Sequence, residues 1–276
     1  MNHSLGFMLA DHDVDVWVGN VCGTRWSHGH ISLSEKDKGT ILSLAAFTQP
    51  EMVKMVEAAA LLCPISYLDH ITAQFPLRLV KIRVDKVIRA LGIHELNFKS
   101  NLLTGLMVKQ SVVIKSHLFF TTFLHEPHPL TTQFYFAGKN YCFNNSRVDI
   151  YLEYEPQPSS SKNLNHLFQM ILKGTFAKYD FGKLRNMMKY GQLKPPVFDL
   201  SHIPDSLPLW LGYGGLDALA DVNNVERTLK ELQSKPELLY LENYAHLDFL
   251  LSVRANEDVY DHMIRFFKSL GKVRSS

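Results

Sequence analysis

The chain has no long hydrophobic run and no strong excess of charge of either sign. Its 276 residues include 29 lysines and arginines against 27 aspartates and glutamates, so the net charge is +2. None of its apolar runs approaches the ~20 residues that an α-helix needs to cross a bilayer, so we expect no transmembrane helix. The balanced charge also argues against a nucleic acid or a strongly acidic protein as the partner.

Cysteine is scarce, and the sequence motifs of several site types are missing. The three cysteines, Cys22, Cys63 and Cys142, allow at most one disulfide and do not indicate a compartment. The histidines of HGH and HEPHP lack the spacing of a metal site, so we expect no metal and no other cofactor. The first twenty residues lack the charged and apolar segments of a signal peptide and run almost at once into a strand-like segment. We therefore expect the chain to begin partway through a domain.

The composition is that of an ordinary globular protein, with 46% hydrophobic and 20% charged residues. The clearest pattern lies near the C-terminus. LPLWLGYGG (207–215) and ELLYLEN (237–243) are typical of buried strands, while DVNNVERTLKELQ (221–233) and EDVYDHMIRFFKSLG (257–271) are typical of amphipathic helices, the last ending at Gly271. Strand, helix, strand and helix at this spacing predict a parallel α/β unit.

The N-terminal third has the same alternation, and the middle of the chain does not. Two segments, DVWVGN (15–20) and AALLCPIS (59–66), are predicted to be strands. The apolar spacing from Thr40 predicts a helix, which is interrupted at Pro50 and then continues toward Ala59. Residues 68–200 differ, because their periodic parts are helical and their other parts are rich in proline and polar residues. RLVKIRVDKVIRALG, for example, places Val80, Val84, Val87, Ile88 and Leu91 on one helical face.

Two residues with catalytic chemistry follow the last two predicted strands. Asp217 comes just after the strand 207–215, and His246 comes just after the strand 237–243. Because functional groups of parallel sheets gather at the carboxyl ends of the strands, we expect these side chains to meet at one edge. An aspartate that orients a histidine, which then acts as a general base, makes up two thirds of a nucleophilic triad. Both residue types also occur commonly as solvated surface residues, so the pair alone does not decide the function.

The sequence around this pair closely resembles the C-terminal part of the acid lipase family, which includes gastric and lysosomal acid lipases and plant and insect triacylglycerol lipases. The family pattern Gly-Gly-x-Asp-x-Leu-Ala-Asp matches GGLDALAD (214–221), and Tyr-x-His-x-Asp-Phe matches YAHLDF (244–249). The resemblance implies that Asp217 is the acid of the triad and His246 its base. Asp221 and Asp248 are then capping or loop-shaping residues.

The resemblance covers nearly the whole chain. DVWVGNVCGTRWSHGH (15–30), GTILSLAAF (39–47) and AALLCPISYLDHI (59–71) are similar to core segments of the family, with Cys22 where an arginine usually stands. The resemblance implies an α/β-hydrolase core formed by residues 1–67 and 201–276, with a helical cap or lid of residues 68–200 inserted into it. It further implies carboxylic ester hydrolysis on a lipid ester or a lipid surface, without a metal or cofactor. Family members are typically secreted or sent to lysosomes or vacuoles, and the oligomeric state stays open.

The pattern breaks where the nucleophile should be. The family places Gly-His-Ser-Gln before the helix GTILSLAAF, so that the serine lies two residues before Gly39, but Asp37 occupies that position. The central strand that leads into this nucleophile elbow and the N-terminal strands before it also have no counterpart, so we expect an incomplete core. Ser27 and Ser43 lack the elbow context. Asp37 has the spacing of the aspartate nucleophiles of epoxide hydrolases, but it lacks the preceding strand.

Two interpretations of function follow from this sequence. The first is a lipase-family ester hydrolase whose activity is impaired because the elbow serine is absent. The second is a non-catalytic truncated isoform or pseudoenzyme that retains at most lipid binding.

Overall fold

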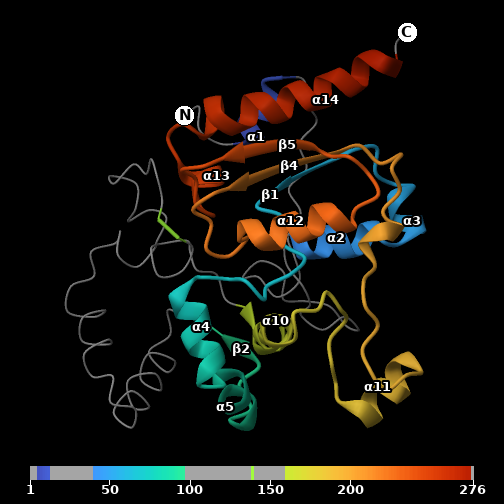
Figure 1. The fold of residues 1–276 in the computed structure, drawn as a ribbon, viewed down its shortest axis with the longest axis vertical. Helices are drawn as coiled ribbons and strands as arrows, with labels where there is room; N and C mark the ends of the chain where they lie inside the picture. Colours follow the sequence, from blue (N-terminus) through green and yellow to red (C-terminus); the bar gives the residue numbers. More distant parts are fainter. Residues whose placement is uncertain (1–4, 13–39, 97–137, 140–158, 275–276) are drawn as a thin grey trace, which may run out of the picture.

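The computed structural model of the 276-residue chain describes residues 5–12, 40–96, 138–139 and 159–274 (Figure 1). The predicted strand at 15–20, the loop at 23–39 with Ser27 and Asp37, and most of the region from 97 to 158 therefore lie outside the described residues.

A three-stranded parallel sheet forms the centre of the molecule. Its strands are β1 (Ala59–Leu62), β4 (Leu209–Gly214) and β5 (Glu237–Leu241), in the order β1-β4-β5. β4 pairs with both neighbours, so that Leu209 lies opposite Ala59 and Trp210 lies opposite Glu237. All but one of the residues of β4 are buried, as expected for a strand covered on both faces. The three strands predicted at these positions are confirmed, with shorter bounds.

Helices cover both faces of this sheet (Figure 1). α14 (Asp261–Arg274) and the short α1 (Leu5–Ala10) lie on one face, and α2 (Thr40–Phe47) and α12 (Val222–Glu231) lie on the other. α12 connects β4 to β5, as the sequence pattern predicts. Each face has an apolar core, and burial of such side chains is the main favourable term in folding. The first contains Trp210, Phe249, Val259, Tyr260 and Met263, and the second contains Leu44, Leu200, Ile203, Leu209 and Leu211.

Two predicted helices have different bounds in the structure. α3 covers only Pro50–Val53, because the chain then turns and enters β1 at Ala59. The closing helix begins with the π-helical turn η3 (Asn256–Tyr260) and continues as α14 to Arg274 instead of ending at Gly271. Gly271 does not adopt the left-handed conformation that a C-terminal glycine cap requires.

The single amphipathic helix expected between residues 78 and 92 is two helices. α4 (Gln74–Lys81) and α5 (Val84–Ala90) are separated by Arg83, whose φ of 52° is left-handed and cannot continue a right-handed helix. The predicted apolar face nevertheless packs, since Val80, Val84 and Ile88 are buried against Phe168. The face ends before Leu91, whose side chain is exposed.

The remaining described elements lie mostly below the sheet in Figure 1. α10 (Ser161–Lys173) packs against α5, and α11 (Lys183–Tyr190) follows it along the chain. β2 (Glu95–Leu96) and β3 (Ser159–Ser160) form a short antiparallel pair. The turn η2 (Leu200–His202) leads back to the sheet, and α13 (Asp248–Leu251) follows β5. Among the described residues, no helix has the length and apolar character needed to cross a membrane. The division at residues 67 and 201 into core and cap stays a prediction.

Candidate active site

The carboxylate of Asp217 is held rigidly at the carboxyl end of β4. Its Oδ1 accepts hydrogen bonds from the backbone N–H groups of Leu219 and Ala220, both at 2.8 Å. The side chain is fully buried. Because a buried carboxylate needs such donors to offset lost hydration, this loop is built to hold a charged aspartate.

The imidazole of His246 meets this carboxylate. Nδ1 of His246 lies 2.9 Å from Oδ2 of Asp217, and the ring keeps 26% of its side-chain surface exposed. The two residues that the sequence pattern singles out are therefore in contact, at the carboxyl ends of neighbouring strands.

The loop that carries His246 can approach β4 because of a glycine. A Cβ atom at Gly214 would lie 2.1 Å from the carbonyl oxygen of Tyr244, so any larger residue would push the loop away. That carbonyl instead accepts a hydrogen bond of 3.0 Å from the N–H of Leu216, next to Asp217. The glycine of the motif thus brings the two catalytic candidates together.

The other two aspartates of the motifs have structural roles, as the sequence predicts. Asp221 is the N-cap of α12 and accepts a hydrogen bond from the N–H of Asn223 at 2.9 Å. Asp248 is buried and accepts a hydrogen bond from the N–H of Ala245 at 2.8 Å, which fixes the residue before His246. The Tyr244 hydroxyl donates to Asp258 at 2.7 Å and anchors the same loop to η3.

This geometry determines what the imidazole can do. A carboxylate has no proton to donate, so Nδ1 of His246 carries the hydrogen and donates it to Asp217. The lone pair is then on Nε2, which can accept a proton from a hydroxyl group. The positive charge that forms on the ring is stabilised by Asp217. The arrangement is therefore that of a general base with its orienting acid.

Cys63 is a third member of this cluster that sequence reasoning missed. It follows β1 directly, is 3% exposed, and has the left-handed φ of 49° that is rare for residues other than glycine. Its thiol donates to the carbonyl oxygen of His246 at 3.5 Å. In the sequence it lay inside the predicted strand 59–66, and only the end of β1 at Leu62 places it at the same sheet edge as Asp217 and His246.

The cluster also has the donor atoms of a metal site. One ligand atom each from Cys63, Asp217 and His246 lies within 4.8 Å of the others. Burial together with the neighbouring Asp217 carboxylate raises the pKa of Cys63 well above its usual range, so the thiol keeps its proton when no metal is bound. In that form it donates a hydrogen bond to the carbonyl oxygen of His246.

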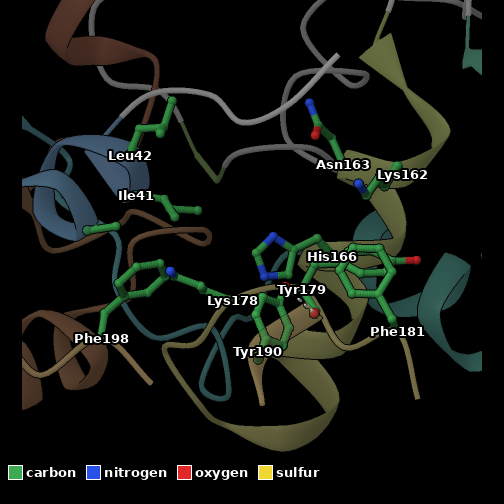
Figure 2. A pocket seen from close by; sticks show the side chains of 11 residues that line it. Ile41, Leu42, Lys162, Asn163, His166, Lys178, Tyr179, Phe181, Tyr190 and Phe198 are labelled. Carbon is green, nitrogen blue, oxygen red and sulfur yellow. Dashed lines mark hydrogen bonds between the residues drawn. The ribbon is translucent and has the colours of Figure 1, made fainter. Parts of the chain in front are cut away.

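A pocket of about 310 Å³ lies apart from this cluster, between α2 and α10 (Figure 2). Neither Asp217 nor His246 is among its lining residues, which are Ile41, Leu42, Ala45, Lys162, Asn163, His166, Lys178, Tyr179, Phe181, Tyr190 and Phe198. Of the alternative nucleophiles, Ser43 lies within α2, whereas Asp37 and Ser27 are outside the described residues.

The chain is similar along its length to plant lipases. It is 50% identical to triacylglycerol lipase 1 of Arabidopsis thaliana, over 99% of the chain and 75% of the relative. It is 32% identical to triacylglycerol lipase 2 of the same plant, over 97% of the chain and 71% of the relative. The chain belongs to the acid lipase-like family of triacylglycerol lipases.

More distant comparisons agree with this family. Rat gastric triacylglycerol lipase is 28% identical over 95% of the chain and 74% of its own length. A crystal structure of a soluble variant of monoglyceride lipase from Saccharomyces cerevisiae matches with a TM-score of 0.51 at 11% identity, covering 84% of the chain and 62% of that structure. The described sheet and helices are thus a partial α/β-hydrolase core. No family model matches the chain.

The alignment with the first of these lipases is longer than the chain. It spans 310 positions, which exceeds the 276 residues of the chain by 34. At least that many positions of the plant lipase therefore have no counterpart here. The loss of a segment before Gly39 stays a prediction.

Proposed function

We propose that Asp217 and His246 are the acid and the base of a lipid ester hydrolase. The observation that carries the proposal is the 2.9 Å hydrogen bond between them, at the ends of adjacent strands in a chain of the triacylglycerol lipase family. The substrate class is a carboxylic ester of a lipid. The fully buried carboxylate and the partly exposed imidazole suit these roles, because the base must reach the substrate and the acid need not.

The proton route follows from the tautomer of His246. Nε2 accepts a proton from the attacking hydroxyl group, whose oxygen bonds to the ester carbonyl carbon. When the tetrahedral intermediate collapses, the bond from this carbon to the alkoxy oxygen breaks and the imidazolium returns the proton to the leaving alcohol. A serine supplies the hydroxyl group in the pattern that the chain resembles. Because Asp37 stands at that position, we propose that water supplies it here and that turnover is slow.

A second candidate function is non-catalytic. In that case the chain keeps the Asp217–His246 pair and the family fold but hydrolyses no ester, and at most it binds lipid. Two observations favour it, namely the aspartate at position 37 and the 34 positions by which the plant lipase alignment exceeds the chain.

Turnover of p-nitrophenyl butyrate and tributyrin by the purified chain separates the two candidates. Hydrolysis that falls about a thousandfold in His246→Ala and in Asp217→Asn supports the hydrolase. Asp221→Asn is the matched control, because it changes a neighbouring aspartate that only caps α12, and asparagine is an equally good cap. Absence of turnover in the wild-type chain supports the non-catalytic form, and turnover that survives His246→Ala rules out the proposed base.

The pair can also be tested without turnover. In the wild-type chain, ¹⁵N chemical shifts of the His246 ring should report a hydrogen on Nδ1. Asp217→Asn places an amide opposite this nitrogen, and we expect the Nδ1–H tautomer to lose its preference. An unchanged tautomer in this variant contradicts the orienting role of Asp217.

A further inference from the structure

The pocket between α2 and α10 has largely apolar and aromatic walls. In Figure 2, Ile41 and Leu42 of α2 form one side, and Tyr179, Phe181 and Tyr190 form the other. Its volume of about 310 Å³ is at the lower end of the range that holds small organic ligands. A chain of a few methylene groups suits such walls, since burial of apolar surface favours binding.

The polar groups that line the same pocket are cationic or neutral. Lys162, Lys178 and His166 lie among the lining residues, and none of the described residues that line it is acidic. Nε2 of His166 donates to the carbonyl oxygen of Ala177 at 2.9 Å, which fixes the ring. The ammonium group of Lys162 lies 5.2 Å from the centre of the Tyr179 ring and is held over the aromatic wall. The pocket therefore offers positive charge beside an apolar interior.

The acidic residue nearest in sequence is already bound elsewhere. Asp180 is paired with Lys173 and accepts hydrogen bonds from the N–H of Gly182 and the side chain of Asn186, both at 2.8 Å. Its charge is thus compensated by groups outside the pocket lining. Lys178 is exposed, and Figure 2 shows it extending toward Phe198 along the pocket. A ligand that neutralises this lysine must bring its own negative charge.

We propose that this pocket binds the anion of a medium-chain fatty acid. The carboxylate lies at Lys178, and the acyl chain lies between the α2 face and the tyrosines of the opposite wall. A neutral lipid would bring no countercharge to Lys178, and a small inorganic anion would leave the apolar walls in water. The inference goes beyond ester hydrolysis, because binding here involves neither Asp217 nor His246 and requires no turnover.

Calorimetric titration with decanoate, below its micellar concentration, tests the proposal on the full chain. Octanoate and 1-decanol serve as the shorter and the uncharged analogues. Each buried methylene group strengthens binding about fourfold, so decanoate should bind about 16-fold more tightly than octanoate. The alcohol should bind more weakly than decanoate, because it cannot pair with Lys178.

A lysine substitution isolates the charge contribution. Lys178→Gln should weaken decanoate binding about three- to fivefold, since the lysine is exposed, and leave 1-decanol binding unchanged. Lys183→Gln is the matched control, since it removes an exposed lysine of the neighbouring α11 that does not line the pocket. No binding of decanoate to the wild-type chain overturns the proposal, as does binding that is insensitive to Lys178→Gln.

One more variant separates this site from the candidate active site. His246→Ala should abolish ester turnover, if turnover occurs, and leave decanoate binding unchanged. Loss of decanoate binding in this variant would place the ligand at the Asp217–His246 pair and overturn the pocket assignment. An inactive wild-type chain that binds decanoate would instead contradict the hydrolase and support the pocket.

Discussion

The central sheet and the helix α11 are stabilised by different kinds of contact. Trp210 and Leu211 of β4 and Phe249 of α13 are at most 1% exposed and pack against other apolar side chains. In α11 the buried residue is Asn186, at 1% exposure. Its Oδ1 accepts from the N–H of Phe181 at 2.9 Å, and its Nδ2 donates to Asp180 and to the carbonyl oxygen of Leu193.

This difference has a consequence for tolerance to substitution. Apolar packing is non-directional, so its loss scales with the volume removed. A buried amide is directional, and removing that of Asn186 leaves two backbone groups without this partner at once. The sheet should therefore be sensitive to the size of a side chain, and position 186 of α11 should be sensitive to its chemistry.

The largest expected effect is that of a cavity in the sheet. Trp210→Ala should lower the free energy of unfolding by about 3–5 kcal/mol, because a large aromatic group is removed from a fully packed site. Leu238→Ala, on the adjacent β5 but 46% exposed, is the control and should cost well under half as much. Urea denaturation followed by circular dichroism measures both. Equal losses would contradict the packing argument.

A smaller effect is expected from the buried amide. Asn186→Ala should lower the free energy of unfolding by about 1–3 kcal/mol, since three hydrogen bonds are lost in a site closed to water. Gln192→Ala removes an exposed amide with one hydrogen bond, to the carbonyl oxygen of Lys194, and should be near neutral. Asn186→Leu replaces the amide by an apolar group of similar size. An unchanged free energy of unfolding in this variant would contradict the comparison.

The smallest expected effect concerns pH. The hydrogen bond from Lys173, supported by those from Asn186 and Gly182, lowers the pKa of Asp180 from 3.8 to about 2. A carboxyl group whose pKa is depressed in the folded state stabilises the fold at pH values above its pKa in the unfolded chain. This contribution is lost as the pH falls from about 4 to 2. Because Lys173 is half exposed, screening limits the effect to about 0.5–1 kcal/mol. Between pH 5 and 2, Asp180→Asn should therefore lose less free energy of unfolding than the wild type.

The sheet was predictable from the sequence because its signals are local. The apolar run of β4 and the amphipathic spacing of α12 each identify an element without reference to the rest of the chain. The break at Arg83 was not predictable, since a left-handed arginine has no propensity signal and its neighbours keep a helical spacing. The helix end predicted at Gly271 was wrong for the opposite reason. Glycine commonly ends helices, but inside a helix it costs only about 1 kcal/mol, and here the helix continues through it.

The site was predictable only in part. Asp217 and His246 could be identified because each follows a strand, and strand ends converge in a parallel sheet. Cys63 carried no motif and lay inside the predicted strand 59–66, so its position after β1 and against the His246 loop appeared only in the structure. The proposed fatty acid pocket is lined by Leu42 and by residues more than a hundred positions later in the sequence. No local sequence pattern indicates that such distant residues line one pocket.

The contacts that hold His246 in place have a practical meaning for protein engineering. Among the described residues, they come from Cys63 and from the segment 209–260, that is, from strand ends, one glycine and the aspartates behind the loop. The contacts on both residues thus come from elements far along the chain from Gly39. If the proposed roles hold, a strand and a serine elbow grafted before Gly39 would meet an Asp217–His246 pair that is already in contact.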